Sequence, residues 1–303
     1  AKAPTSTDAG RRHLVGQVAG ACGHDAHMAI LLGAARLLSA RREELAGDVL
    51  FLFQPGEEGF GGAKILLDEG LLEREGPVAA AFAIHVEPSA RTGQLESRPG
   101  ALLAATDQFS ITVQGKGGHG SRPHLAVDPI PVACEIVLAL QAMLTRRLDA
   151  TDPSVLTVTQ IHAGTTTNVI PAAVELQGTL RTLSAENRER LLDGVKRVVQ
   201  GVASAHAAQA QLELHPGYPS ACNDPEFTKL VFAVGRELFG KTQVSELPAP
   251  KLYAEDFSYI LEKIPGAMFF LGASPQDGEA HPVHSDRMRL DETVMCRGAA
   301  LHA

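Results

Sequence analysis

The spacing of apolar residues begins with an alternation of strands and helices. Residues 49–53 and 79–86 are continuous apolar runs, which are typical of strands buried on both faces of a parallel sheet. Apolar residues recur at helical spacing over residues 30–38, in a helix that Asp25 is expected to cap, and again over residues 61–72. This alternation predicts an α/β unit built on a mostly parallel sheet.

The pattern changes near residue 107. Apolar and polar residues alternate over residues 109–113, which is typical of a half-exposed antiparallel strand. Two predicted helices, over residues 129–148 and 185–207, are interleaved with further strands. Those strands are expected at residues 155–161, 174–183 and 211–214. The order β-α-β-β-α-β is that of the ferredoxin-like unit, whose four-stranded sheet is covered by helices on one face only.

After Pro216 the first pattern resumes. A helix is predicted over residues 227–239, an apolar strand over residues 267–271 and a closing helix over residues 292–301. A chain of 303 residues is long enough for two domains. Their expected bounds are residues 1–106 and 217–303 for the first, discontinuous domain, and residues 107–216 for the second, which is inserted into it.

Composition limits the classes of partner. An apolar content of 45% and a charged content of 20% are ordinary for a soluble globular protein. The net charge of −8 argues against nucleic acid or an anionic membrane surface as partner. No run is expected to span a bilayer, and residues 1–12 lack the apolar segment of a secretory signal. The four cysteines lie far apart without CxxC spacing, so free thiols in a reducing cytoplasm are expected.

Chemically unusual residues gather where the predicted strands end. They are Cys22 and His24 before the first helix, Glu57 and Glu58 after residues 49–53, His85 at the end of its apolar run, and His284 after residues 267–271. In an open α/β sheet, the carboxyl ends of parallel strands open into one crevice where ligands bind. A thiolate, imidazoles and carboxylates that converge there form a transition-metal site with a built-in base. The sequence therefore indicates a metal-dependent hydrolase.

Each of these features also has a plainer interpretation. A buried cysteine usually behaves as a small hydrophobe, and a lone histidine in an apolar run is more often a core residue than a ligand. Glu57 and Glu58, flanked by glycines, could be solvated loop residues. One shared site explains the features better than separate coincidences. In an extended segment the two glutamates would point in opposite directions, so one could bind metal while the other acts as a base. The residues alone do not decide which glutamate binds metal and which acts as the base.

Six motifs in order give the chain a specific resemblance. They are CGHDAH at residues 22–27, FQPGEEG at 53–59, GKGGHG at 115–120, NVIP at 168–171, GTLR at 178–181 and AEDF at 254–257. They resemble the metallo-amidohydrolases of aminoacylase type that include hippurate hydrolase, N-acyl-amino-acid deacylases and plant auxin-conjugate hydrolases. The resemblance extends from about residue 22 to the C-terminus and is specific to the family, not to a substrate.

The resemblance implies a binuclear site for two divalent ions, which could be Zn²⁺, Mn²⁺, Co²⁺ or Ni²⁺. The implied metal ligands are Cys22, His24, Glu58, His85 and His284. It further implies that Glu57 is the general base. The implied reaction is hydrolysis of the amide of an N-acyl amino acid, hippurate-like or N-acetylated, or of a small peptide conjugate, by a metal-activated water.

The inserted domain resembles the lid and dimerisation domain of a homodimer. His119 resembles a lid histidine that stabilises the oxyanion, often across the dimer. Asn168 and Arg181 resemble groups that hold the carboxylate or amide of the substrate, and the planar fork of arginine suits a carboxylate. Without the resemblance, His119 would lie in an ordinary glycine loop, Asn168 in a turn and Arg181 on a solvated strand.

Two alternatives to a metallohydrolase remain open, and one departure from the family favours the first of them. Relatives of this type carry about a further hundred residues before CGHDAH, comparable to a small domain. The first alternative is therefore a catalytically impaired, truncated relative that acts as a dimeric binding protein. The second is a thiol hydrolase with Cys22 as nucleophile and His24 as base, which leaves both glutamates, His85 and His284 unexplained.

Overall fold

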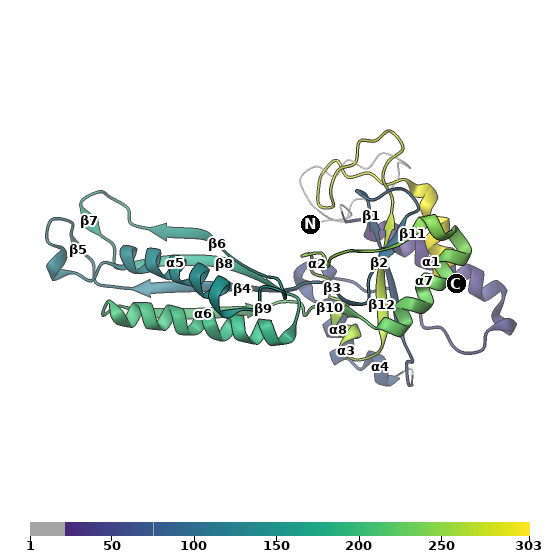
Figure 1. Ribbon diagram of the computed structural model, residues 1–303, viewed down its shortest axis with the longest axis horizontal. Helices are drawn as coiled ribbons and strands as arrows, with labels where there is room; N and C mark the ends of the chain where they lie inside the picture. Colours follow the sequence, from purple (N-terminus) through teal and green to yellow (C-terminus); the bar gives the residue numbers. More distant parts are fainter. Residues whose placement is uncertain (1–21, 75) are drawn as a thin grey trace.

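The computed structural model describes residues 22–74 and 76–303, so the expectations for residues 1–21 lie outside the described residues. Figure 1 shows two lobes joined by a narrow connection. One lobe contains a sheet in the strand order β1-β12-β2-β11, and the other contains a sheet in the order β6-β8-β4-β9. The chain enters and leaves the second lobe through this connection (Figure 1).

The sheet of the first lobe is mostly parallel. Its strands are β1 (Ala81–Glu87), β12 (Gly266–Gly272), β2 (Leu95–Ser97) and β11 (Val244–Glu246). β1 pairs in parallel with β12 along its whole length, and β2 pairs in parallel with β11. The antiparallel pairing of β12 with β2 is confined to Phe270 and Leu271. Every residue of β12 is buried, as its apolar run predicts.

Three longer helices belong to this lobe, namely α1 (His24–Ala40), α7 (Pro225–Phe239) and α9 (Met295–His302). α1 and α9 pack so closely that a Cβ at Gly33 would lie 2.9 Å from that of Ala299. The prediction that Asp25 caps α1 is wrong. The helix begins at His24 after Gly23, so Asp25 lies in its first turn.

The other elements of the first lobe are short. They are the 3₁₀ helices η1 (Arg42–Glu44), η3 (Lys241–Gln243) and η4 (Glu292–Val294), the helices α2 (Glu57–Phe60), α3 (Gly62–Asp68), α4 (Leu71–Arg74) and α8 (Ser258–Leu261), and the paired strands β3 (Gly100–Leu103) and β10 (Ala221–Asn223). The single helix predicted over residues 61–72 is divided because Gly70, at φ 85°, ends α3 and precedes α4.

The strand predicted at residues 49–53 is not formed. Within the described part of the chain these residues pair with no strand, and Val49, Leu50 and Phe53 are 48%, 47% and 44% exposed. An apolar run becomes a buried strand only when neighbouring strands accept its backbone hydrogen bonds and cover its faces. The sequence pattern shows that this segment is apolar, but it does not show whether strands lie beside it to pair with it.

The second lobe has the predicted β-α-β-β-α-β order. It consists of β4 (Ala105–Gln114), α5 (Pro129–Arg147), β6 (Ser154–Ala163), β8 (Ala173–Thr182), α6 (Ala185–Ala205) and β9 (Gln209–Pro216). Each neighbouring pair in its sheet is antiparallel. Figure 1 shows α5 and α6 on one face, with β5 (Gly118–His119), η2 (Pro123–Leu125) and β7 (Val169–Ile170) at the tip farthest from the first lobe.

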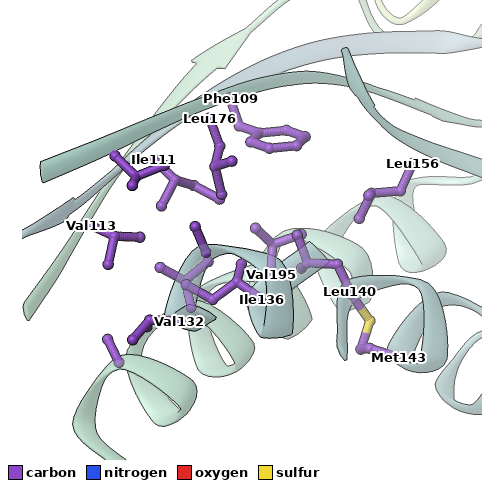
Figure 2. Close-up of a cluster of buried hydrophobic side chains, with 14 of the residues drawn as sticks. Phe109, Ile111, Val113, Val132, Ile136, Leu140, Met143, Leu156, Leu176 and Val195 are labelled. Atoms are coloured by element: carbon purple, nitrogen blue, oxygen red, sulfur yellow. The ribbon is translucent and has the colours of Figure 1, made fainter. Parts of the chain in front are cut away.

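The core of the second lobe lies between its sheet and its two helices (Figure 2). Phe109 and Leu176 point from the strands toward Ile136 and Leu140 of α5. Contrary to the sequence expectation, α5 is long and apolar enough to cross a membrane by length and composition. In this fold its apolar stripe is part of the core, which accounts for its hydropathy.

Two segments connect the lobes side by side. The N–H of Gly217 donates to the carbonyl of Thr106 at 3.0 Å, and the N–H of Thr106 donates to the carbonyl of Tyr218 at 2.9 Å. Beside them, Arg188 of α6 binds the buried carboxylate of Asp107 through two hydrogen bonds of 2.9 and 2.6 Å. The connection is therefore a hydrogen-bonded pair of extended segments anchored by an ion pair.

Candidate metal centre

The first group of possible ligands forms where α1 begins against the end of β1. Gly23, at φ 92°, lies so close to this strand that a Cβ would be 2.4 Å from the side chain of Val86. This approach brings Cys22 and His24 beside His85, with Cys22 Sγ 3.4 Å from His85 Nε2. One ligand atom from each of the three residues lies within 4.8 Å of the others.

Hydrogen bonds orient His85 for ligation. Its Nδ1 lies 2.7 Å from the carbonyl oxygen of Val86, which only a protonated nitrogen can bind, so Nε2 is free to act as a ligand. Burial lowers the pKa of His85 to about 4, which keeps the ring neutral at pH 7. His27 packs its ring 4.5 Å from that of His85 and accepts the N–H of Val86 through Nε2 at 3.0 Å.

Glu57 and Glu58 lie on the same side of the turn, not on opposite sides as an extended segment would require. They begin α2, whose backbone leaves helical geometry at Glu58 and Gly59. His24 Nε2 lies 3.7 Å from Glu57 Oε2 and 3.9 Å from Glu58 Oε1. The alternation expected of an extended segment is absent because left-handed glycines form a tight turn instead.

His284 completes the group from a loop after β12. Its Nε2 lies 3.2 Å from Glu58 Oε1, and Cys22, Glu58 and His284 form a second triad with ligand atoms within 4.8 Å. The backbone of His284 has φ 67°, a strained conformation for a residue other than glycine. All five predicted ligands thus converge, and Cys22 belongs to two of the three triads that the described residues form.

The electrostatics of the cluster favour bound cations. Burial, together with the charges of Glu58 and Asp256, raises the pKa of Glu57 to about 7. Burial and the charges of Glu58 and Glu57 raise the pKa of the Cys22 thiol. Burial and the charges of Glu57 and Asp256 raise the pKa of Glu255 well above its usual range. Crowded carboxylates beside a buried thiol are costly without positive charge, and the mixed S, N and O donors suit transition metals. The residues present therefore fit a pair of divalent ions.

Three residues outside the predicted set of ligands and catalytic groups, Gln54, Tyr218 and Asp256, hold the glutamate turn in place. Asp256 is fully buried and accepts the N–H of Ala63 at 2.9 Å and the side-chain amide of Gln54 at 2.6 Å. The hydroxyl of Tyr218 bonds the backbone of the turn itself. Gln54 and Asp256 belong to two of the sequence motifs, which was a usable signal, whereas no motif includes Tyr218.

Arg181 lies at the end of β8 that adjoins the connection between the lobes. Its Nη1 donates to the hydroxyls of Thr106 and Thr179, the latter at 2.7 Å, and to the carbonyl of Leu180 at 2.9 Å. Burial lowers its pKa. The guanidinium is thus held rigidly beside the connection, instead of standing free in solvent as the plainer interpretation expected.

His119 and Asn168 lie together but far from the ligand cluster. His119 pairs with Val169 between β5 and β7, and the carbonyl of Asn168 accepts the N–H of Gly120 at 2.9 Å. Both residues are at the tip of the second lobe, whereas α2 and β1 lie in the first (Figure 1). The ten residues of β4 separate the connection from the tip by about 30 Å.

Comparison with known proteins identifies the family. The family model of peptidase family M20/M25/M40 matches residues 7–303. The chain is 38% identical to thermostable carboxypeptidase 1 of Saccharolobus solfataricus over 302 residues, which cover 98% of this chain and 75% of that protein. It is 37% identical to N-acetyl-L-cysteine deacetylase of Bacillus subtilis over 279 residues, which cover 92% of this chain and 65% of that protein.

A solved structure supports the same assignment. A Bacillus subtilis protein described as a dinuclear metal-binding peptidase of family M20 superposes with a TM-score of 0.77 at 33% identity. The match covers 93% of this chain and 70% of that one. The family model spans nearly the whole sequence and these relatives share over 30% identity across most of their length, so the chain belongs to the hydrolases of peptidase family M20/M25/M40.

Proposed function

We propose that this chain hydrolyses the amide bond of N-acyl amino acids, such as hippurate or N-acetyl amino acids, or of small peptide conjugates. The observation that carries the proposal is the convergence of five metal-type donors around Glu57. The relatives named above, a carboxypeptidase and an N-acetylcysteine deacetylase, both act on amide bonds next to an amino acid and support this substrate class.

Two divalent ions are proposed for the donor cluster. The proposed ligands are Cys22, His24, Glu58, His85 and His284, with Cys22 in a position common to two triads. When bound, such ions polarise the scissile carbonyl and lower the pKa of a water to about 7. Zn²⁺, Mn²⁺, Co²⁺ and Ni²⁺ all suit these donors. The four free cysteines support a reducing compartment such as the cytoplasm.

Glu57 is proposed as the general base. Its carboxylate adjoins His24 but is mostly shielded from solvent, with 18% of the side chain exposed. It can accept a proton from the attacking water and deliver it to the leaving amine nitrogen, which releases the free amino acid and the carboxylic acid. A raised pKa of about 7 suits a group that must both accept and return a proton at neutral pH.

Substrate binding is proposed for the inserted lobe, residues 107–216, acting as lid and dimerisation domain. Arg181, fixed through Nη1 beside the connection, suits the carboxylate of the amino-acid product half. His119 would stabilise the oxyanion and Asn168 would hold the amide, but only from a second copy of the chain. A rotation of the lobe about the connection cannot bring His119 and Asn168 to the donor cluster of the same chain, because it keeps the tip about 30 Å from the connection. The backbone of Glu57, in contrast, is bonded to Tyr218 within the connection.

Exposed apolar residues support the dimer. Leu138 on the outer face of α5 is 71% exposed, and Ile161 on the edge strand β6 is 53% exposed. An edge strand with unpaired backbone groups is also a ready partner for the equivalent strand of a second copy. These features support a homodimer formed by the inserted lobe, as the sequence resemblance implies.

The geometry counts against a thiol hydrolase. A nucleophilic cysteine needs an accessible thiolate with a lowered pKa. Cys22 is buried, and burial together with Glu58 and Glu57 raises the pKa of its thiol. The same anions are favourable for cation binding, so this environment supports a ligand and not a nucleophile.

The first test measures metal content together with hydrolysis of hippurate and N-acetyl amino acids, before and after treatment with EDTA. We expect about two ions per chain and activity that chelation abolishes. Glu57→Gln should lower kcat by about a thousandfold while metal content is retained. Glu175→Gln, on the exposed face of the second sheet, is the matched control and should be fully active. Metal-free, inactive protein would instead favour the dimeric binding protein, and more than a few per cent activity in Glu57→Gln would refute the base assignment.

The second test asks whether the site is shared between two copies. Glu57→Gln and His119→Ala should each be inactive alone. If they are dissociated, mixed and reassociated, half of the dimers are hybrids in which one of two sites has both residues intact. Activity should then recover to about a quarter of that of the unmodified protein. No recovery from demonstrably hybrid dimers would show that His119 does not act across the dimer.

A further inference from the structure

The turn that carries the two glutamates is held by one hydroxyl from a distant part of the chain. Tyr218 Oη accepts the N–H groups of Gly59 at 2.9 Å and Gly61 at 3.2 Å, and it donates to the carbonyl of Glu57. A tyrosine hydroxyl offers one donor and two acceptor positions, and all three are used here. The tyrosine therefore binds both ends of the turn.

Asp256 holds the flanking residues Gln54 and Ala63, but between them the turn has little besides Tyr218 to fix its shape. Gly56, Gly59 and Gly61 have φ of 73°, 81° and 65°, and Glu58 is non-helical, so regular helical hydrogen bonds do not define it. None of the residues of α2 is buried, and Phe60 is 79% exposed, so apolar packing does not anchor it. A glycine-rich turn has many alternative conformations, which the hydroxyl of Tyr218 restricts.

Tyr218 belongs to the connection between the lobes. Its carbonyl accepts the N–H of Thr106 at 2.9 Å, and the hydroxyl of Thr106 accepts a hydrogen bond from Arg181. The ring of Tyr259 packs 6.0 Å from that of Tyr218. Thr106 and Tyr218 therefore fix the position of the Arg181 guanidinium, proposed to bind substrate, relative to the turn that carries the proposed base.

We propose that Tyr218 is a positioning residue that sets the direction of the Glu57 and Glu58 side chains relative to the connection between the lobes. It acts through the backbone of the turn, because its hydroxyl bonds main-chain groups of Glu57, Gly59 and Gly61. The inference rests on the proposed function for its consequence in catalysis. The restraint on the turn can be measured separately.

The test compares Tyr218→Phe with Tyr259→Phe. The first removes the three bonds to the turn and keeps the ring. The second is matched in chemistry and location, since Tyr259 Oη donates to Gly217 of the same connection at 3.3 Å but does not bond the turn. Hydrogen exchange of the metal-free protein should be about tenfold faster at Gly59 and Gly61 in Tyr218→Phe. Exchange at these amides should be unchanged in Tyr259→Phe.

Two further measurements follow the consequence for the site. Divalent-ion affinity, measured by competition with a chelator, should fall about tenfold in Tyr218→Phe because Glu58 is no longer held in place. In the metal-loaded protein, kcat should fall about tenfold with KM within about twofold of its original value. Tyr259→Phe should show neither change.

The outcomes separate the two proposals. Unchanged exchange at Gly59 and Gly61 in Tyr218→Phe would overturn the positioning role, whatever the activity. Faster exchange with unchanged ion affinity and kcat would also overturn it, because the turn would then not direct the carboxylates. Exchange at β12 amides reports global stability and must stay constant for the comparison. If Glu57→Gln remained active, the proposed base would be wrong, while the exchange result would still test the restraint.

Discussion

Replacement of Asp256 tests the support of the glutamate turn most directly. This carboxylate is completely buried just before α8, and each of its oxygens has one partner. Oδ2 accepts the N–H of Ala63 at the beginning of α3, and Oδ1 accepts the amide of Gln54 before the turn. The two partners enclose residues 55–62, so Asp256 fixes both ends of the segment that contains Glu57.

The structure gives different costs for two substitutions. Asp256→Ala removes both hydrogen bonds and leaves the fully buried N–H of Ala63 without its acceptor, which costs about 3 kcal/mol in total. For a lobe of this size, that lowers Tm by roughly 6–12 °C. Asp256→Asn can still accept from Ala63 and can donate to Gln54 after the glutamine amide rotates. Its cost should be about 1 kcal/mol, or roughly 2–4 °C.

Thermal unfolding of the metal-free protein is the assay, because bound ions would add their own stabilisation. A matched control is Asp277→Ala, on the exposed loop after β12, where Asp277 pairs with Arg289 in solvent and should affect Tm little. Equal Tm losses in Asp256→Ala and Asp256→Asn, or losses no larger than that of the control, would contradict the role of these two hydrogen bonds. Equal shifts would mean that negative charge, not hydrogen bonding, holds the segment.

Two further predictions concern the second lobe and the pH dependence of stability. Asp107→Ala should destabilise the protein by about 3 kcal/mol in thermal unfolding, because it leaves the partly buried Arg188 without its carboxylate. His302 packs against Phe82 and burial lowers its pKa to about 4. Between pH 6.5 and about 4, this histidine is therefore protonated in the unfolded state but still neutral in the folded state. The free energy of unfolding should fall as the pH drops through this range, by at most about 1.4 kcal/mol per pH unit from this group. His302→Phe should remove that part of the slope.

Both predictions have internal controls. Asp149→Ala changes an exposed aspartate just after α5 in the same lobe and should cost far less than Asp107→Ala. A similar loss in both would contradict the importance of the buried pair. For the pH series, His215→Gln on the exposed sheet face should leave the slope unchanged. Because burial also lowers the pKa of His85 to about 4, part of the slope should remain in His302→Phe; a slope equal to that of the unmodified protein would show that His302 does not contribute.

The sequence was informative wherever local pattern determines structure. The period of two over residues 109–113 and the helical spacing over residues 129–148 identify β4 and α5, and the ferredoxin-like order follows from connecting such elements. The pattern fails at residues 49–53, where burial depends on neighbouring strands. It also misses β2 and β11, because strands of three residues are too short to show a period.

The site was predictable only to the extent that topology brings chain segments together. His85 reaches Cys22 because β1 runs in parallel beside β12 and ends at the start of α1, which the carboxyl-end rule anticipates. The relative direction of Glu57 and Glu58 was not accessible, because it depends on three left-handed glycines and on hydrogen bonds to Tyr218 and Asp256, far away in sequence.

That dependence has a consequence for how the fold supports the proposed chemistry. The donors of the two triads that share Cys22 come from rigid elements, the start of α1 and the strand β1, and from two strained or glycine-rich loops at Glu58 and His284. Rigid elements hold ligands without outside help, whereas loops must be fixed by bonds from elsewhere. Glu58 obtains these bonds through the turn that Tyr218 and Asp256 restrain. A chain that preserved all five donors but lost those two residues would therefore keep its ligands and lose the geometry that lets them act together.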